Sequence, residues 1–304
     1  MSLVDIAMAT YNGEKYVRAQ IQSIITQSFA NFRLFIRDDG STDSTVSIIR
    51  EYVKKDARIH FIEDDLGNLR VSRNFEQAMS YCTAPYIMFA DQDDVWLENK
   101  IDTSLSFIRK VEIKNKPVLV FCNSILANEA LDKEYGNNYS NNSEVGLRSF
   151  LFGNAGYQGA AMIFNHDLKQ KALPFLANST VHDYHISLIG LLLGQVYFIS
   201  EPLMIYRRHG NTTTKQSLTF LERLKCFYGG NSILYNDKML NYLKEFTSVH
   251  KVNITKENLN LLADYFEILD VKTSFFKKMN LVFKNKFVVR GSSKYLILKI
   301  FMLR

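Results

Sequence analysis

The chain has 304 residues, of which 47% are hydrophobic and 22% charged, a composition typical of a globular rather than a disordered protein. This length suits one large domain, or one domain with an appendage. The longest apolar runs, at 188–194 and 295–303, fall well short of the ~20 residues that span a bilayer, so we expect no membrane-crossing helix. The N-terminus carries Asp5 and no basic segment before an apolar one, so we also expect no secretory signal.

The net charge of +6 is concentrated at one end of the chain. Residues 271–304 contain nine lysines and arginines and no acid, which leaves 28 basic against 31 acidic residues in 1–270. The three cysteines, Cys82, Cys122 and Cys226, are far apart in the sequence. This spacing favours reduced thiols in a cytoplasm over a disulfide framework or a zinc site.

Apolar, β-branched runs that predict buried strands recur through the first two thirds of the chain. They lie at 3–9, 32–36, 59–62, 86–90, 118–122, 160–164 and 196–199. Helical patterns alternate with them, as at 43–55, where Val46, Ile49 and Val53 share a face, and near 183–193. The alternation predicts an α/β fold of Rossmann type, with a mostly parallel sheet, helices on both faces and ligands beyond the carboxyl ends of the strands.

Strand signals end near Asn211, and helical spacing dominates the rest of the chain, for example at 220–228. We therefore expect two domains, an α/β domain at 1–212 and a helical, basic C-terminal extension at 213–304. In the extension, Phe275, Phe276, Met279, Val282 and Phe283 follow helical spacing, with Lys272, Lys277, Lys278 and Lys284 off this stripe. Such a helix is typical of a membrane interface, although a core-packing helix with a basic outer face has the same pattern.

Polar motifs follow three of the predicted strands: TYNGE after 3–9, RDDGSTD after 32–36 and ADQDD after 86–90. In the last motif, Asp91, Asp93 and Asp94 stand close enough to repel one another, unless they only form a solvated turn. A divalent cation would cancel the repulsion and would also take up phosphate oxygens. The motif therefore predicts a metal ion that carries a diphosphate.

Two motifs that the sequence lacks limit which phosphate compounds the protein is expected to bind. The chain has neither the G-x-x-x-x-G-K-[ST] loop of NTPases nor a G-x-G-x-x-G turn after its first predicted strand. Instead Asp38 and Asp39 follow the second strand, where a carboxylate can accept hydrogen bonds from a base or from ribose hydroxyls. A helix cap beside a turn glycine is the alternative role for one of them.

Three segments in this order carry a resemblance to a known family: IAMATYNGEKYVRAQIQSIITQS, RDDGSTDST and FADQDDVW. Over about the first 210 residues the chain resembles glycosyltransferase family 2, whose members have the GT-A fold and transfer a sugar from a nucleotide diphosphate. The segments VHDYHISL at 181–188 and YRRHGNTT at 206–213 are most similar to the branch that builds bacterial surface polysaccharides, rhamnosyltransferases among them.

The resemblance assigns roles to individual residues of this sequence. It implies a nucleotide site formed by Thr10, Asn12, Glu14, Asp38, Asp39, Asn68, Arg73 and Asp91. It implies a Mn or Mg site formed by Asp91, Asp93 and His209, with Asp93 in direct contact and Asp91 on the ribose or on a water of the metal; a hydrogen bond to a phosphate is the alternative role for His209. Asp183 would be the catalytic base. Contacts to the diphosphate or the acceptor would come from Arg207, Arg208, Gln158, Gly159 and His182. The family usually has Glu-Asp where this chain has His182-Asp183, which leaves open whether His182 touches the acceptor.

The resemblance thus implies an inverting, metal-dependent glycosyltransferase. It would move a sugar such as rhamnose, glucose or galactose from a UDP or dTDP donor to a hydroxyl of a bacterial surface polysaccharide or lipid-linked glycan, as in capsule or cell wall synthesis. A nucleotidyltransferase and a non-catalytic sugar-nucleotide-binding module are the alternatives; the first would carry a glycine-rich basic loop where this chain has TYNGEKY.

The basic tail suggests where the protein works. With it we expect a cytoplasmic protein, peripheral at the inner face of the bacterial plasma membrane, that docks on anionic lipid or on a partner subunit. No DNA- or RNA-binding motif accompanies the tail, so we expect no nucleic acid partner. The sequence leaves open whether the chain forms a homo-oligomer.

Overall fold

The computed structural model describes residues 2–140, 145–153, 156–179, 181–210, 237–288, 296–297 and 300. The chain divides into two compact units: Met1–Asn142 with Gly156–His209, and Ser143–Ala155 with Gly210–Arg304. The domain boundary expected at 212/213 lies outside the described residues. Within the described ranges, no helix combines the length and the apolar character needed to cross a bilayer.

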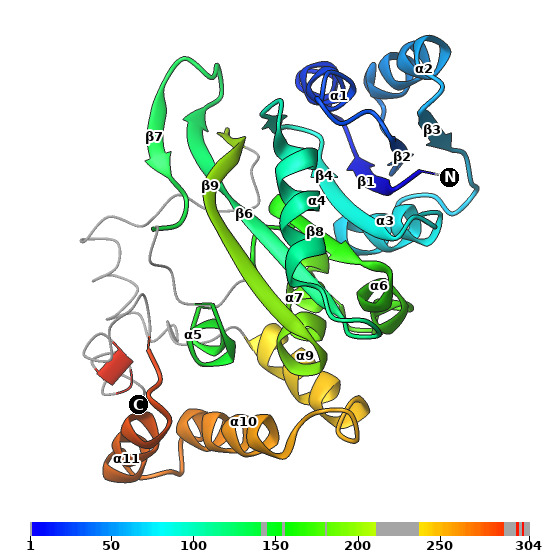
Figure 1. Ribbon diagram of the computed structural model, residues 1–304. Coiled ribbons are helices and arrows are strands. Elements are labelled where there is room, and N and C mark those ends of the chain that lie inside the picture. Colours follow the sequence, from blue (N-terminus) through cyan, green and yellow to red (C-terminus); the bar gives the residue numbers. More distant parts are fainter. Residues whose placement is uncertain are drawn as a thin grey trace. The chain divides into compact units, whose positions relative to one another are not determined.

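Four parallel strands build one half of the nine-stranded sheet in the first unit (Figure 1). Their order in the sheet is β3 (Ile59–Ile62), β2 (Phe32–Asp38), β1 (Val4–Thr10) and β4 (Tyr86–Asp91). The helices between them are α1 (Val17–Ile25), α2 (Thr45–Lys55) and α3 (Arg70–Ser80). Nearly every residue of β1 is buried, because a central parallel strand is covered on both faces. This double coverage explains the continuous apolar run at the start of the sequence.

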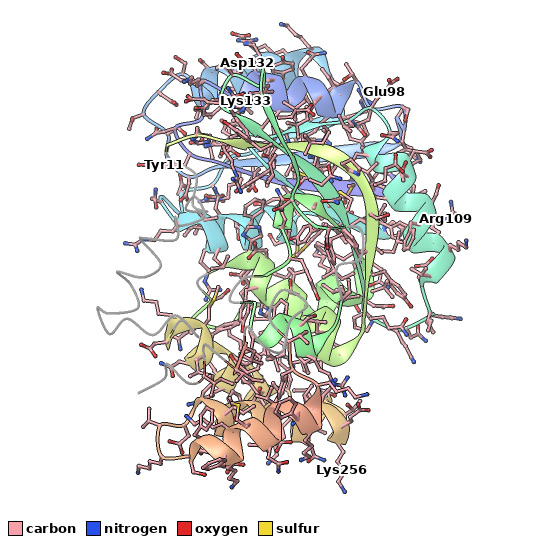
Figure 2. All side chains as sticks on the ribbon, turned by 90° about the vertical axis from the view of Figure 1, so that its left-hand side faces the viewer. Tyr11, Glu98, Arg109, Asp132, Lys133 and Lys256 are labelled. Carbon is pink, nitrogen blue, oxygen red and sulfur yellow. The ribbon has the colours of Figure 1, made fainter. Side chains whose placement is uncertain are left out.

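The other half of the sheet is mixed. β8 (Met162–Asn165) pairs antiparallel to both β4 and β6 (Val118–Asn128), and β9 (Gln195–Arg208) runs parallel to β6. β7 (Glu134–Asn137) pairs with β6, and Asp132 and Lys133 lie at the surface in the turn between them (Figure 2). β5 (Val95–Trp96) pairs with the distal part of β9. Because β5 closely follows β4, this pairing brings the end of β9 to the loop after β4.

Helices complete the first unit. These are α4 (Lys100–Val111), α6 (His166–Ala172) and α7 (His182–Leu193), with a 3-10 turn at Gly159–Ala161. The architecture confirms the expected fold class, and all seven predicted strand regions contain a strand. β5 and β7 were not predicted, since one has two residues and the other is exposed throughout, so neither forms an apolar run. Cys82 and Cys122 are buried free thiols, whereas Cys226 and the helical spacing at 220–228 lie outside the described residues.

The described residues of the second unit form helices and short loops. The helices are α5 (Leu147–Leu151), α9 (Asp237–Val249), α10 (Lys256–Leu269) and α11 (Phe275–Asn285). Thr255 caps the start of α10 and Ser274 the start of α11, each through a side-chain oxygen that accepts a backbone N–H. The Tyr265 hydroxyl donates to the carbonyl oxygen of Leu151 at 2.9 Å, which ties α10 to α5.

The orientation of α11 differs in part from the sequence prediction. Leu281 and Val282 are buried together with Lys278, which the prediction had placed off the apolar stripe. Phe276 and Phe283 are instead 84% and 61% exposed. Positions 278, 281 and 282 share a face at the i, i+3, i+4 spacing of a helix, and the aliphatic stem of a lysine can be buried beside apolar neighbours. One face of α11 therefore packs inward while aromatic rings remain outside.

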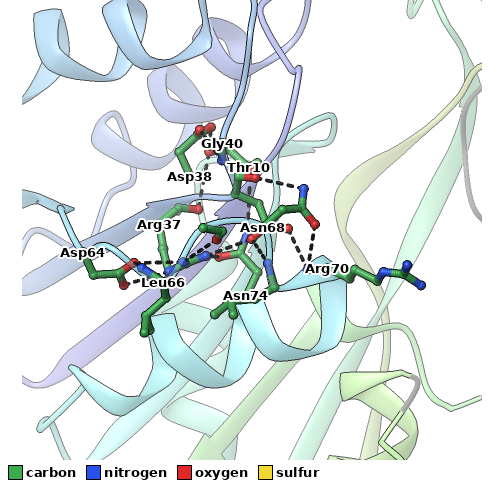
Figure 3. A network of polar contacts seen from close by, with 12 residues as sticks. Thr10, Arg37, Asp38, Gly40, Asp64, Leu66, Asn68, Arg70 and Asn74 are labelled. Atoms are coloured by element: carbon green, nitrogen blue, oxygen red, sulfur yellow. Dashed lines mark hydrogen bonds and ion pairs between the residues drawn. The ribbon is translucent and has the colours of Figure 1, made fainter.

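A buried arginine at the end of β2 binds the segments around it through its guanidinium group (Figure 3). Arg37 is 1% exposed and donates from Nε and Nη2 to both oxygens of Asp64 at 2.9 Å. Its Nη1 donates to Asp39 Oδ1 at 2.9 Å and to Asn74 Oδ1 at 3.0 Å, and Nη2 also donates to the Gly67 carbonyl at 3.0 Å. The guanidinium thus joins β2, the loop before α3 and α3 itself.

Asp39 has a second structural role in this network. Its two carboxylate oxygens accept the backbone N–H groups of Leu69 at 2.6 Å and Arg70 at 2.8 Å, at the start of α3. An acid there satisfies helix N–H groups that lack partners within the helix and complements its dipole. Arg70 has a φ of 63°, and its side chain extends away from the network in Figure 3.

Replacement of the buried cation tests this network. We expect Arg37→Met to lower the free energy of unfolding by about 3 to 5 kcal/mol, because Asp39 and Asp64 would keep their charges without a partner. Arg50→Met is the matched control, since its partner is Glu63 and both side chains are exposed, at 59% and 64%. A change below about 1 kcal/mol is expected there. Urea denaturation of both variants measures the difference, and equal losses would contradict the assigned role of Arg37.

Candidate functional site

The ends of β1, β2 and β4 place three polar loops at one edge of the sheet. In the parallel register Thr10 lies opposite Asp38, and Ala9 lies opposite both Arg37 and Asp91. Because neighbouring parallel strands end together, the three motifs that are far apart in the sequence meet here. This is the edge at which open α/β sheets bind ligands.

Hydrogen bonds join the loops after β1 and β2. The Thr10 hydroxyl donates to Asp38 Oδ1 at 2.8 Å, and Asn12 Oδ1 accepts the Thr42 N–H at 2.9 Å. Glu14 Oε2 accepts the Ser44 N–H at 2.9 Å, just before α2. Thr10, Asn12 and Glu14 therefore join the two loops to each other, and their role in a nucleotide site stays a prediction.

The two consecutive acids after β2 differ in their surroundings. Asp39 is 3% exposed and is held by Arg37 and the start of α3. Asp38 is only half-buried, and its Oδ2 accepts the N–H groups of Gly40 and Ser41 at 3.1 Å and 2.7 Å. Asn68 is exposed beside them and donates to the Asp39 carbonyl at 3.0 Å.

Arg73 points toward a different segment. Its guanidinium pairs with Glu76 and donates to the carbonyl oxygens of Phe175, Leu176 and Ala177. In this structure the side chain ties α3 to the loop after α6. Its resemblance-based role at the diphosphate stays a prediction.

Buried carboxylates crowd together after β4. Burial, followed by the negative charges of Asp93 and Asp183, raises the pKa of Asp91 to about 8. Burial and the charges of Asp93 and Asp91 raise the pKa of Asp94 well above its usual range. Asp94 Oδ1 accepts the Arg207 N–H at 3.2 Å, but Asp94 Oδ2 has no partner within the described residues. Repulsion of this kind favours either protons or a bound cation.

The donor types present here are ones that divalent cations bind, and a cation between them would offset the repulsion and lower the pKa values of the acids. Carboxylate oxygens and an imidazole suit Mn²⁺ and, for the carboxylates, Mg²⁺. His209 Nε2 already contacts Asp93 Oδ2 at 2.8 Å. In the parts of the chain that the structure describes, however, no three His, Cys, Asp or Glu side chains are grouped so that they could hold a metal ion.

Arg207 and His209 come from the end of β9. Arg207 is buried, and its Nε donates to the carbonyl oxygen of Asp93 at 2.7 Å. Its Nη1 donates to the carbonyl oxygen of Glu129. Arg208 is half-buried. The guanidinium of Arg207 thus holds the loop after β4, and its predicted contact with a diphosphate stays a prediction.

Asp183 lies in the first turn of α7, and its neighbours come from the segment before β8. Burial raises the pKa of Asp183 to about 7, opposed by backbone hydrogen bonds from Tyr184, Asp183 itself and Gly159. Asp183 Oδ1 has no partner among the described residues. A Cβ at Gly159 would lie 2.6 Å from His182 Nε2 and 3.3 Å from Asp183 Cβ, so glycine permits this close approach.

His182 is enclosed by aromatic rings. It stacks on Phe75, with ring centroids 3.8 Å apart, and meets Phe89 edge-on at 5.1 Å. Burial lowers the pKa of His182 to about 3, so the imidazole is neutral, and neither ring nitrogen has a partner in the described parts of the chain. Gln158 Oε1 accepts from Ser124 Oγ at 2.8 Å, whereas its Nε2 is also unpaired there.

Two further residues at this edge escaped the sequence analysis. Gln92 forms two hydrogen bonds with the backbone of Tyr11, accepting its N–H at 2.9 Å and donating to its carbonyl at 3.0 Å. Lys100 is fully buried, with Nζ 4.7 Å from the centroid of the Trp96 ring, and its charge lowers the pKa of Asp94. Lys100 lies in no motif, and Gln92 lies within ADQDD, where the prediction concerned only the aspartates.

The pKa of Asp183 predicts a pH-dependent stability of the protein without ligands. The folded chain keeps a proton on Asp183 up to about pH 7, whereas the unfolded chain releases it near its ordinary pKa of 3.8. The free energy of unfolding of the wild type should therefore fall as pH rises from 4 to 8. Asp183→Asn removes this loss and should be the more stable protein at pH 8, by on the order of 1 to 4 kcal/mol, but not at pH 4.

Denaturation of both proteins across this pH range measures the effect, with Asp102→Asn as the control, since Asp102 is an exposed acid in the first turn of α4. A difference between Asp183→Asn and wild type that stays constant with pH would contradict the prediction.

Comparison with known proteins places the chain among sugar transferases. An uncharacterized glycosyltransferase of Rickettsia typhi is 24% identical over 98% of this chain and 90% of its own length. The dTDP-rhamnosyl transferase RfbG of Shigella flexneri is 25% identical over 72% of this chain and 77% of its own length.

A solved structure shares the fold. The mannosyltransferase PcManGT of Pyrobaculum calidifontis, in complex with GDP-Man and Mn²⁺, matches 99% of this chain and 73% of its own with a TM-score of 0.54 at 12% identity. The model of the family described as "Glycosyl transferase family 2" matches residues 5–162, slightly more than half of the chain. This match covers the loops after β1, β2 and β4, and the chain therefore belongs to glycosyl transferase family 2.

Proposed function

We propose that the protein transfers a sugar from a nucleotide diphosphate donor to a hydroxyl of a growing bacterial surface polysaccharide or lipid-linked glycan, with inversion at the anomeric carbon. The observation that carries this proposal is the group of half-buried acids Asp91, Asp93 and Asp183 near the carboxyl ends of the parallel strands. The charges on Asp93 and Asp183 raise the pKa of Asp91, so the three acids lie within one electrostatic environment.

The donor is proposed to be a UDP- or dTDP-sugar, with rhamnose, glucose or galactose as the sugar. The similarity to a dTDP-rhamnosyl transferase supports the dTDP alternative. The base and ribose would lie against the loops after β1 and β2, near Thr10, Asn12 and Asp38, because these loops form one hydrogen-bonded wall. Asp38 is the better candidate for the base than Asp39, whose oxygens already serve α3 and Arg37.

A divalent cation, Mn²⁺ or Mg²⁺, is proposed to bind at Asp91, Asp93 and His209. When bound, it would supply positive charge that stabilises the departing diphosphate. A structure of similar fold, a mannosyltransferase, holds GDP-Man and Mn²⁺, which supports a metal-assisted donor site on this fold. Arg208 would contact the diphosphate, since the guanidinium of Arg207 already serves two backbone carbonyls.

Asp183 is proposed to act as the general base. Its carboxylate would take the proton from the acceptor hydroxyl while the oxygen bonds to the anomeric carbon and the bond to the diphosphate oxygen breaks. Attack from the face opposite the diphosphate inverts the configuration. A pKa of about 7 suits a base that works near neutral pH. Gly159 lies against His182 and Asp183, and together with Gln158 these residues would form the acceptor side of the site.

Two substitutions separate the proposed roles of the acids. Asp183→Asn should lower kcat by about 10²- to 10⁴-fold, the usual contribution of a general base, with donor binding nearly unchanged. Asp93→Asn should instead weaken Mn²⁺-dependent donor binding. Sugar transfer from UDP-, dTDP- and GDP-sugars to a lipid-linked glycan measures the first effect, calorimetry measures the second, and NMR of the product reports the anomeric configuration.

Asp102→Asn serves again as the control acid. Full transfer by Asp183→Asn would remove its role as base. Donor binding without any transfer by the wild type would favour a non-catalytic binding module.

The second unit is proposed to hold the protein on an anionic membrane at the cytoplasmic face. Phe276 and Phe283 are exposed on α11, and Lys272 is exposed beside them. Lys277 and Lys284 form ion pairs with Glu267 and Asp264 of α10, which partly neutralises their charge. The aromatic rings would therefore supply most of the affinity, at about 1.5 to 3 kcal/mol for each ring buried.

Vesicle binding tests this docking surface. The double variant Phe276→Asp with Phe283→Asp should lose at least about 100-fold in affinity for phosphatidylglycerol vesicles in a sedimentation assay, since each of the two rings contributes more than about 1.4 kcal/mol, or tenfold. Val252→Asp is the matched control, because Val252 is 96% exposed but lies outside α11. Equal binding by all three proteins would exclude α11 as the docking surface, and no binding by wild type would favour a partner subunit.

A further inference from the structure

We propose that Tyr16 is a positioning residue that fixes the His209 ring against Asp93, and that Glu129 and Arg207 hold Tyr16 in place. This inference rests on the proposed function, in which His209 and Asp93 bind the cation. Its basis is a set of contacts among four segments that lie far apart in the sequence. None of the motifs or comparisons assigns a role to Tyr16 or Glu129.

The Tyr16 ring is the centre of the contacts. It stacks on the His209 imidazole with ring centroids 4.7 Å apart and an interplanar angle of 27°. The guanidinium carbon of Arg207 lies 5.0 Å from the Tyr16 ring centroid, within the range of a cation–π contact. Tyr16 directly precedes α1, so its backbone belongs to an ordered helix start.

Glu129 anchors the other end of Tyr16. Its Oε1 accepts the Tyr16 hydroxyl at 2.6 Å and also pairs with the Lys15 ammonium. The Glu129 carbonyl oxygen accepts a hydrogen bond from Arg207 Nη1. Glu129 lies just past the end of β6, in the turn whose Asp132 and Lys133 are labelled in Figure 2. One residue thus fixes both the ring and the guanidinium that contacts it.

The same contacts fix both members of the His209–Asp93 pair. His209 follows the last residue of β9, and its Nε2 lies 2.8 Å from Asp93 Oδ2. The stacked Tyr16 ring restricts the rotation of the imidazole about this contact. On the other side, Arg207 holds the Asp93 carbonyl through Nε and Asp94 through its backbone N–H. Such outer contacts orient ligand side chains before a metal binds.

Direct measurement of Mn²⁺ binding tests the inference without an acceptor substrate. Tyr16→Leu should weaken Mn²⁺ binding in the presence of UDP or dTDP by about 10- to 100-fold, the range seen when residues that orient metal ligands are removed. Tyr16→Phe keeps the ring and should retain most of the affinity. Glu129→Gln leaves the ring in place but loosens its anchor, and should give an intermediate loss. Paramagnetic resonance of free Mn²⁺ measures all of these affinities.

Tyr81→Leu is the matched control, because Tyr81 is 44% exposed and follows α3, away from these contacts. Kinetics should agree: Tyr16→Leu should lower kcat and raise the Mn²⁺ concentration for half-maximal rate, with a similar KM for the acceptor. A merely structural role would lower the melting temperature without changing that concentration.

Asp93→Asn separates a failure of this inference from a failure of the proposed function. If Asp93→Asn abolishes Mn²⁺ binding and Tyr16→Leu leaves it unchanged, Tyr16 has no positioning role. If wild type and Asp93→Asn bind Mn²⁺ equally weakly, the metal site itself is wrong, and the inference fails with it.

Discussion

The cost of ionising carboxylates that are shielded from water and close to one another is the constraint on which the architecture of the site depends. Burial alone disfavours the ionised forms of Asp91, Asp94 and Asp183, and their neighbours disfavour the first two further. A protein that only needed a turn after β4 would gain stability from uncharged side chains there. Under the proposed function, a positive charge that arrives with the ligand would offset this cost.

The topology of the sheet decides which segments of the chain meet at the site. The four parallel strands bring Thr10, Asp38 and Asp91 to one edge by register alone. β8 then pairs antiparallel to β4 and leads through α6 toward α7, which carries Asp183. β9 lies between β6 and β5 and pairs with both, so the end of β9, with His209 after it, comes to Asp93. The family model matches residues 5–162 and so covers the loops after β1, β2 and β4. Asp183 on α7 and His209 after β9 lie beyond the matched residues.

The sequence predicts what depends on local pattern and misses what depends on partners. Buried strands are visible because parallel strands covered on both faces form continuous apolar runs, and the motifs stand at their ends. Whether Arg73 binds a phosphate or three carbonyl oxygens depends on residues about a hundred positions away in the sequence. The periodicity of apolar residues does not reveal such distant partners. Gln92, Lys100 and Tyr16 were missed for the same reason. The burial of Lys278 depended on which face of α11 meets the rest of the second unit.

The consecutive acids Asp38 and Asp39 illustrate how one motif serves both stability and function. Alternate residues of a strand point to opposite sides, and the two carboxylates at the end of β2 have separate surroundings. One lies with the buried Arg37 and the start of α3, the other with the loop after β1. Because α3 is fixed through Asp39, a change there would also move Asn68 and the loop beside Asp38. Loss of binding in an Asp39 variant would therefore not identify a ligand contact, whereas loss in an Asp38 variant of unchanged stability would.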